Sequence, residues 1–326
     1  MRCSKCTSAI TESQKTGLVV KAVAEPRPTH SPYDVSMQPA PSVCLPKHLL
    51  LPAAGLGRRM KAIDPTLPKE LLPILDKPAI QYAIEEGISA GLTHVIVVIN
   101  PHKEIIRRYF EDHKFRAILY PKTAPELTEA IKKCSFTFLY QQTPYGEVDA
   151  IRLAAPILGD DPFAIVYPDD VYYPFREALS ALSSAFLDTE LDVIALSQVN
   201  FRNAFAVGNT GKVSLTPLAK DLYEITHFHP KGPGSFELRS KTKLRTCGIM
   251  ISKPHIFDYI DEINPTLADE FTDVILRIHM LQRERFLGYR LPGQLYDVGN
   301  PAGYRNCISE LSLLLSHSKT ALNTGA

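Results

Sequence analysis

The sequence of 326 residues lacks an excess of charge of either sign. Lys and Arg total 36 and Asp and Glu total 35, so the formal net charge is +1. A protein that binds nucleic acid usually carries a marked basic excess. The balance argues against a nucleic-acid partner, and any positive charge that meets phosphate must be placed locally.

Long apolar runs are also missing. A membrane-spanning helix needs about 18 or more consecutive apolar residues, whereas the longest apolar stretches here, such as residues 94–99, have the length of a strand. The N-terminus carries no continuous apolar segment of the kind found in secretory signals. We therefore expect no membrane segment and a cytoplasmic location.

Cysteine is scarce and scattered. The six cysteines do not have the spacing of a disulfide framework, which favours a reducing compartment in a chain of this length. The close pair Cys3-x-x-Cys6 lacks the nearby second pair that a zinc site requires. We interpret both residues as thiols of a loose tail.

The first 46 residues differ in composition from the rest. Proline removes backbone donors and disfavours helix in the preceding residue, and this stretch contains Pro26, Pro28, Pro32, Pro39, Pro41 and Pro46. The pattern predicts a disordered leader over residues 1–46. A folded domain is expected over residues 47–316, followed by a tail at 317–326.

Within that domain, short β-rich runs alternate with amphipathic helical patterns. Strands are predicted over residues 48–51, 94–99, 137–140, 163–167 and 192–196, and helices over 77–91, 104–113, 176–187, 269–283 and 302–315. Such alternation predicts a single Rossmann-like, doubly wound and mostly parallel sheet flanked by helices. Residues 205–251 are richer in β-like segments and predict a β-rich insertion.

A glycine-rich segment follows the first predicted strand. Gly55 and Gly57 allow the backbone to approach a phosphate closely, and a turn of this kind exposes N–H groups that can hold it. Arg58, Arg59 and Lys69 add positive charge. Alone, this G-x-G is no more specific than a plain turn, because neither common phosphate-binding fingerprint is present.

The complete string of motifs is far more specific. It consists of the loop at residues 55–59, Pro68-Lys-Glu-Leu-Leu-Pro73, Asp76-Lys-Pro78 and Gln81-Tyr82. In order and spacing it resembles the start of the bacterial UTP–glucose-1-phosphate uridylyltransferases and the related glucose-1-phosphate thymidylyltransferases. The resemblance covers residues 47–315 and implies the nucleotide-diphospho-sugar transferase type of fold.

The resemblance also implies a nucleotide site. Its residues would be Ala53, Ala54, Gly55, Leu56, Gly57, Gln141 and Gly146. The carboxamide of Gln141 offers both a donor and an acceptor to the imide edge of uracil or thymine. Arg59 and Lys69 are implied as catalytic cations on the phosphates.

Two aspartates match the metal-binding positions of the family. Asp169 follows the predicted strand 163–167, where a carboxylate at the carboxyl end of a parallel strand points into the ligand crevice. Asp297, in Tyr296-Asp-Val-Gly-Asn300, matches the second position. The resemblance implies that both hold Mg²⁺ and that Asp169 also lies on the sugar.

The sugar side departs from the family pattern. Relatives carry a V-E-K-P segment, whereas residues 225–230 read Ile-Thr-His-Phe-His-Pro, so Phe228 replaces the Glu and His229 the Lys. Ala206 replaces a glycine that lies beneath the sugar. We expect Ala206 and Phe228 at the sugar, and either His229, when protonated, or Lys231 as the phosphate cation.

The resemblance implies a UTP–glucose-1-phosphate uridylyltransferase that forms a UDP-sugar and pyrophosphate. We also expect a homo-oligomer. Because three sugar-side positions are altered, two alternatives stay open. One is a pyrophosphorylase for another sugar 1-phosphate or for dTTP. The other is a catalytically impaired regulator that only binds nucleotide.

Overall fold

The computed structural model describes residues 44–143, 145–208, 211–230, 242–263 and 271–323, within a unit that spans Val43–Ala326. Nearly all of the predicted leader, and the candidate cation Lys231, lie outside the described residues. The domain boundaries predicted at residues 46 and 316 stay predictions.

A nine-stranded sheet forms the centre of this unit, in the order β5-β4-β1-β6-β11-β8-β12-β10-β9. The strands are β1 His48–Pro52, β4 His94–Ile99, β5 Ser135–Tyr140, β6 Phe163–Val166, β8 Asp192–Asn200, β9 Val213–Ala219, β10 Leu222–Phe228, β11 Thr242–Ser252 and β12 Phe286–Arg290. Strands β5, β4, β1 and β6 are mutually parallel, whereas β11 is antiparallel to both of its neighbours. The predicted Rossmann-like α/β class is confirmed.

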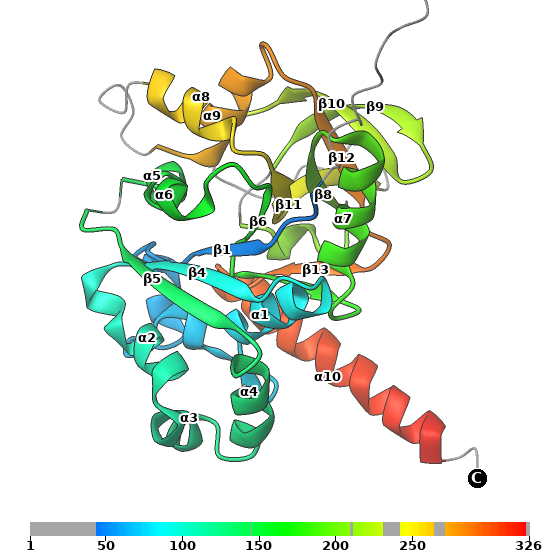
Figure 1. Ribbon diagram of the computed structural model, residues 1–326. Coiled ribbons are helices and arrows are strands. Elements are labelled where there is room, and N and C mark those ends of the chain that lie inside the picture. The colour runs from blue at the N-terminus through cyan, green and yellow to red at the C-terminus, as the bar shows by residue number, and fades with distance from the viewer. Residues whose placement is uncertain (1–43, 144, 209–210, 231–241, 264–270, 324–326) are drawn as a thin grey trace, which may run out of the picture. The chain divides into compact units, whose positions relative to one another are not determined.

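The two faces of the sheet are covered by different helices (Figure 1). One core contains Leu49 and Leu51 of β1 with side chains of α1 Ala79–Ser89, α2 Glu104–Glu111, α4 Ala124–Ile131 and α7 Ala178–Thr189. The other contains Leu50 with side chains of α5 Glu147–Leu153, α6 Ala155–Leu158, α8 Ile256–Glu262 and α9 Asp273–Met280. Strands buried on both faces are apolar at successive positions, which explains the unbroken Leu run in β1.

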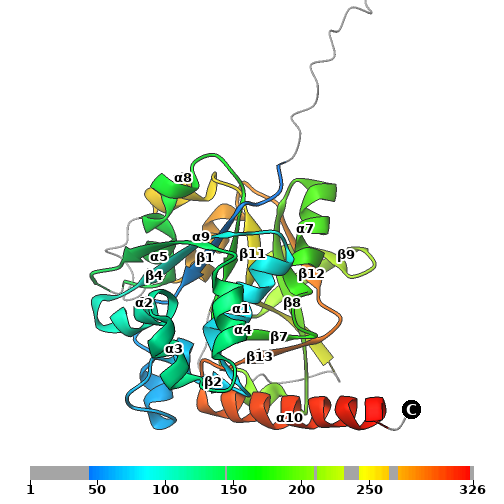
Figure 2. The ribbon, with the colours of Figure 1, turned by 60° about the horizontal axis from the view of Figure 1, so that its bottom comes forward.

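Two short sheets lie beside the central one. β2 Pro73–Ile74 pairs with β3 Lys77–Pro78, and β7 Asp170–Tyr173 pairs antiparallel with β13 Gln294–Asp297, which sets Asp297 opposite Asp170. α10 Pro301–Asn323 packs against β13 (Figure 2). The helix therefore continues past the predicted end at residue 315, since no proline or glycine interrupts it before Gly325.

The remaining elements are short. They are the 3-10 helices η1 Arg58–Ala62, η2 Lys69–Leu71, η3 Pro101–Lys103 and η4 Ala204–Ala206, together with α3 His113–Leu119. Strands β1, β4 and β6 are parallel, so their carboxyl ends lie at one edge of the sheet, where ligands bind in open α/β sheets. No helix among the described residues is long and apolar enough to cross a membrane.

Candidate active site

The glycine loop after β1 borders a cavity of about 440 Å³, here called the nucleotide-side cavity. Six of the seven predicted nucleotide residues line it, together with Arg59 and Lys69. The exception is Ala53, which is buried and donates its N–H to the Val98 carbonyl at 2.7 Å. The structure thus brings the predicted loop, base-reading and cationic residues to one cavity.

Gly57 has a backbone conformation that favours glycine. Its φ is +59°, in the left-handed region, and it precedes η1. A Cβ built there would lie 3.6 Å from Cγ of Lys69. The loop therefore packs against the aliphatic stem of Lys69, which couples the glycine loop to the Pro68–Pro73 segment.

A buried ion pair supports the loop from behind. Lys103 Nζ donates to both carboxylate oxygens of Glu70 and to the Ala53 carbonyl, each at 2.8 Å. Asn100 Nδ2 donates to the Ala54 carbonyl at 2.5 Å. Burial lowers the pKa of Lys103, and the Glu70 charge opposes that shift. Both supporting residues follow β4, and sequence reasoning missed them because only the parallel β1–β4 pairing brings them to the loop.

Gln141 is buried and is held by two acceptors. Its Nε2 donates to the Gly146 carbonyl at 3.0 Å and to Asp149 Oδ2 at 2.9 Å. Both amide hydrogens are thereby engaged, so Oε1 is the atom of Gln141 left to meet a ligand. Gly146 has φ +120°, and a Cβ there would lie 2.4 Å from the Phe271 carbonyl oxygen, so a side chain does not fit.

The structure brings Asp169 and Asp297 close together. A Cβ built on Gly299 would lie 2.2 Å from Asp169 Oδ2 and 3.3 Å from Asp297 Oδ1, so these two oxygens are at most 5.5 Å apart. Asp169 lies in the turn between β6 and β7, and Asp297 ends β13. The β7–β13 pairing therefore joins two carboxylates that are far apart in the sequence.

Lys69 is the immediate partner of Asp169. Its Nζ lies 2.5 Å from Asp169 Oδ2. Burial acts to lower the pKa of Lys69, but the Asp169 and Glu70 charges raise it well above its ordinary value. Burial likewise acts to raise the pKa of Asp169, and Lys69 holds it below its usual range. Both groups are therefore charged at neutral pH.

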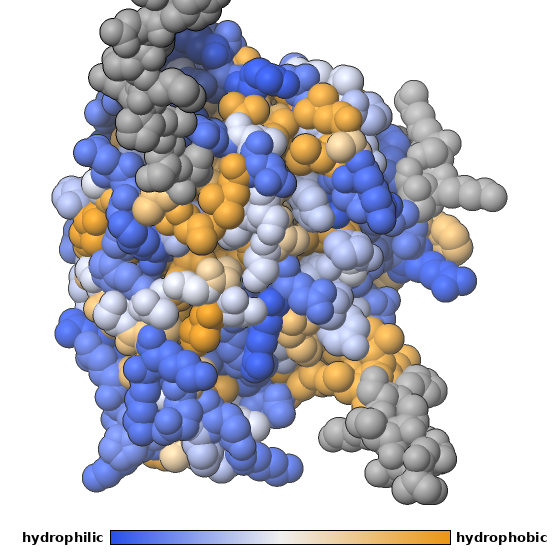
Figure 3. Space-filling model, turned by 45° about the vertical axis from the view of Figure 1, so that its right-hand side comes forward, coloured by the Kyte–Doolittle hydropathy of each residue, from blue (hydrophilic) through white to orange (hydrophobic). Residues whose placement is uncertain are grey.

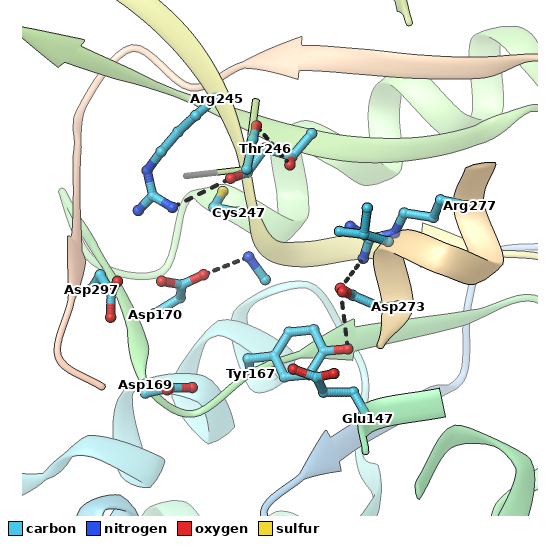
Figure 4. A pocket seen from close by; sticks show the side chains of 13 residues that line it. Glu147, Tyr167, Asp169, Asp170, Arg245, Thr246, Cys247, Asp273, Arg277 and Asp297 are labelled. Atoms are coloured by element: carbon cyan, nitrogen blue, oxygen red, sulfur yellow. Dashed lines mark hydrogen bonds and ion pairs between the residues drawn. The ribbon is translucent and has the colours of Figure 1, made fainter. Parts of the chain in front are cut away.

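A second cavity, of about 110 Å³, lies beyond Asp169 and is here called the sugar-side cavity (Figure 4). It shares Glu147, Tyr167 and Asp169 with the nucleotide-side cavity. Its other charged side chains are Asp170, Arg245, Asp273, Arg277 and Asp297. The two cavities thus meet at Asp169.

Asp170 lies in the wall of the sugar-side cavity, next to Asp169. It accepts a hydrogen bond from the Gly248 N–H at 2.5 Å. Burial raises its pKa to about 7, the Arg245 charge opposes the rise, and the Asp297 and Asp169 charges add to it. Among the described residues, Arg245 is thus the arginine whose charge acts on Asp170, beside two further carboxylates.

The structure does not bring the predicted sugar residue Phe228 to either cavity. Its side chain is 1% exposed and packs edge-on against Phe286, with ring centroids 5.4 Å apart. A register shift between Ile225 and His227 in β10 turns both Ile225 and Phe228 into the same core. A side chain so buried cannot contact a sugar, so Phe228 does not lie where the alignment to V-E-K-P requires it.

The other sugar-side candidates have mixed positions. His229 lines neither cavity, and its Nε2 lies 3.1 Å from Ser214 Oγ. Burial and then the His227 and Lys212 charges lower its pKa, so it is neutral at pH 7. Ala206 is buried at a small cavity of about 10 Å³ that Arg245 and Asp297 also line.

The carboxylate pair fits a magnesium ion by its chemistry. Mg²⁺ prefers carboxylate oxygens and is usually held by one or two of them plus water and substrate phosphates. Over the described ranges, no group of three or more His, Cys, Asp or Glu side chains is arranged to hold a metal. Asp169 and Asp297 therefore suit an ion whose remaining ligands are phosphate oxygens, rather than an ion whose ligands all come from the protein.

Comparison with known proteins identifies the class. The family model described as "Nucleotidyl transferase" matches residues 48–312. The chain belongs to the nucleotidyl transferase family, and the family recognition and transferase class predicted from the sequence are confirmed.

Within that family, the chain is similar to UTP–glucose-1-phosphate uridylyltransferases. It is 31% identical to UTP–glucose-1-phosphate uridylyltransferase 1 of Staphylococcus saprophyticus over 265 residues, which cover 79% of this chain and 90% of that one. It is 30% identical to the enzyme of Bacillus subtilis over 273 residues, covering 81% and 90%.

Solved structures of UDP-glucose pyrophosphorylases are also similar to this chain. A UDP-glucose pyrophosphorylase complexed with UDP-glucose matches with a TM-score of 0.70 and 28% identity, covering 82% of this chain and 99% of that one. A UTP-bound UDP-glucose pyrophosphorylase of Acinetobacter baumannii, at 24% identity and a TM-score of 0.67 over 85% and 99% of the chains, supports the fold.

Proposed function

We propose that this protein transfers a uridylyl group from UTP to glucose 1-phosphate, forming UDP-glucose and pyrophosphate. The observation that carries the proposal is the junction of the two cavities at Asp169, with Asp297 within 5.5 Å. One cavity has a glycine loop and cations suited to a triphosphate, and the other, which shares Asp169, is the proposed place of the second substrate.

The reaction needs no protein nucleophile. An oxygen of the sugar phosphate attacks the α-phosphorus of UTP in line, and a new P–O bond forms. The bond from that phosphorus to the oxygen bridging to the β-phosphate breaks, and pyrophosphate leaves with the electron pair. Catalysis then consists of positioning and charge neutralisation, for which Lys69 and Arg59 are the proposed cations.

Gln141 is proposed to recognise the base. Because its amide hydrogens are engaged by Gly146 and Asp149, its Oε1 would accept a hydrogen bond from N3–H of uracil. Thymine offers the same N–H, so this contact selects uracil or thymine over cytosine. It does not by itself separate UTP from dTTP.

Asp169 and Asp297 are the proposed holders of Mg²⁺. When bound, the ion would neutralise triphosphate charge and orient the α-phosphate. The role of Lys69 in this proposal is to keep Asp169 ionised and to contact phosphate, since it lies 2.5 Å from that carboxylate.

The test is pyrophosphate release from UTP and from dTTP with a panel of sugar 1-phosphates. We expect release with UTP and glucose 1-phosphate. Release with another sugar or with dTTP alone would favour the alternative pyrophosphorylase. Binding of UTP without release for any sugar would favour a regulator that only binds nucleotide.

A homo-oligomeric state is also proposed. Apolar side chains are visible at the surface (Figure 3), and the exposed ones of α10 include Leu313 and Leu314, which are 59% and 41% exposed. A second copy covering α10 would bury them. Sedimentation of the wild type and of Leu313→Glu tests this, and a monomeric wild type would contradict it. The cytoplasmic location stays a prediction.

A further inference from the structure

The geometry of in-line attack separates the incoming sugar phosphate from the leaving pyrophosphate. The sugar phosphate must approach the α-phosphorus from the side opposite to the leaving pyrophosphate. Arg58, Arg59 and Lys69 lie on the nucleotide-side cavity. A cation in the sugar-side cavity, across Asp169, would be placed to meet the sugar phosphate. His229 lines neither cavity and so cannot supply this charge from its place in the structure.

Two arginines among the described residues line the sugar-side cavity, and they differ in their partners. Arg277 is neutralised, because its Nη2 lies 2.9 Å from Asp273 Oδ2. Within the part of the chain that the structure describes, the buried Nε of Arg245 has no hydrogen-bond partner, and its Nη1 reaches the Thr246 carbonyl only at 3.4 Å. Figure 4 shows its guanidinium pointing into the cavity on the side of Asp170 and Asp297.

The nearby carboxylates do not take up these donors. Asp170 accepts from the Gly248 N–H, and Asp297 accepts from the N–H groups of Gly208 and Gly299 at 2.7 and 3.1 Å. Arg245 is only 4% exposed, so its Nε is withdrawn from bulk solvent. A buried cation with open donors is unfavourable unless a ligand fills them.

We propose that Arg245 binds the phosphate of the sugar 1-phosphate, the contact that the lysine of V-E-K-P would make in relatives. A guanidinium presents paired N–H donors that match two phosphate oxygens. β11 carries it on the far side of Asp169 from the glycine loop, where the attacking phosphate must lie. This inference rests on the proposed function.

The experiment measures sugar and nucleotide binding separately. Arg245→Met should raise KM for glucose 1-phosphate by about 10- to 100-fold, the loss expected for one charge-assisted contact. The Kd for UTP with Mg²⁺, measured calorimetrically without sugar, should stay within about twofold of wild type. Arg245→Lys keeps the charge but loses the paired donors, so its KM for glucose 1-phosphate should lie between those of the wild type and Arg245→Met.

Two controls separate binding from folding. Arg290→Met makes the same change on β12, where Arg290 pairs with Asp221 and lines neither cavity, and it should leave both constants unchanged. The melting temperature of Arg245→Met is the check on folding, because the loss of a charge that favours ionised Asp170 acts against the gain from burying an apolar side chain. A cooperative transition above the assay temperature shows that the KM is measured on folded protein. If Arg245→Met does not fold, the test uses Arg245→Lys instead. A raised KM for glucose 1-phosphate in that variant supports the inference, and an unchanged KM overturns it.

An unchanged KM for glucose 1-phosphate in Arg245→Met would overturn the inference. So would an equal loss of UTP affinity, or a KM effect carried by Lys231→Ala or His229→Ala in its place. Failure of the proposed function has a different signature, namely wild-type protein that binds UTP but releases no pyrophosphate. In that case glucose 1-phosphate is titrated directly into the UTP complex. Binding lost in Arg245→Met supports the inference, and no binding by the wild type overturns it.

Discussion

The two cavities of this protein differ in how their walls are assembled. The wall of the nucleotide-side cavity that is proposed to bind phosphate comes from residues 52–70, a short segment whose glycines and cations lie close together in the sequence. The sugar-side cavity is lined from α5, β7, β11, α9 and β13 and from the loops beside them, which are spread over residues 147–297. Because the first wall is one short motif, sequence changes in other strands can alter the second cavity without altering the first.

The difference extends to charge. Two lysines at or behind the nucleotide-side cavity are paired with carboxylates, Lys69 with Asp169 and Lys103 with Glu70. On the sugar side, the Nε of Arg245 has no hydrogen-bond partner among the described residues, while Arg277 is paired with Asp273. If the proposed functions hold, the lysines of the first cavity are held in place before a substrate binds, whereas Arg245 in the second would gain its partner from the substrate.

The largest expected effect is on the scaffold of the nucleotide side. Lys103→Met should lower the free energy of unfolding by about 3–5 kcal/mol, because it leaves Glu70 as a buried charge without its partner. Urea denaturation measures this. The double variant Lys103→Met with Glu70→Gln should be more stable than Lys103→Met alone. Equal stability of the two would show that the ion pair does not support the loop.

The second largest effect should come from changes to the two aspartates at the junction of the cavities. Asp297→Asn and Asp169→Asn should each lower turnover by about 10²–10³-fold, the usual loss when a preorganised charge is removed from a reacting site. Melting temperatures should change little. Pyrophosphate release over a Mg²⁺ titration is the measurement. Full activity in either variant would contradict the shared role of the two carboxylates.

A smaller effect should appear in base selection. Asp149→Leu removes one of the two acceptors that engage Gln141 Nε2, so the amide could then donate to N3 of cytosine. The preference for UTP over CTP should fall by about tenfold, which corresponds to one hydrogen bond. Arg152→Met is the control, because it removes the partner of Asp149 at 2.6 Å and leaves Gln141 held. An unchanged preference would mean that Asp149 does not set the base contact.

The smallest effect should be at His229. Its pKa is lowered by burial, so the neutral form is favoured in the folded state. Its contribution to stability is present above the unfolded pKa of about 6.5 and is lost as pH falls through the folded value. His229→Gln should reduce the acid sensitivity of the melting temperature and leave turnover at pH 7.5 within about twofold. If wild-type activity rises toward acid pH and the activity of His229→Gln does not, protonated His229 contacts the phosphate after all.

Several features of the fold departed from the sequence-based expectation for local reasons. The helix predicted over residues 104–113 ends at Glu111, because Asp112 caps a new helix, accepting from the N–H groups of Lys114 and Phe115 at 3.0 Å. α4 was not predicted at all. The register shift in β10 places Phe228 in the core. A shift of this kind inserts an extra residue into one strand, and the alternation of apolar and polar residues in the sequence does not predict it.

The sequence by itself determined the α/β class, the family, and the segments that supply the glycine loop, Lys69, Gln141, Asp169 and Asp297. These are readable because each lies in a short segment whose spacing or position after a strand carries the information. Only the tertiary structure decided which remote groups complete the site. Lys103 reaches the loop through the β1–β4 pairing, Asp297 reaches Asp169 through β13–β7, and Arg245 enters the sugar-side cavity from β11. Contacts across paired strands depend on register and topology, and neither is encoded in a local pattern.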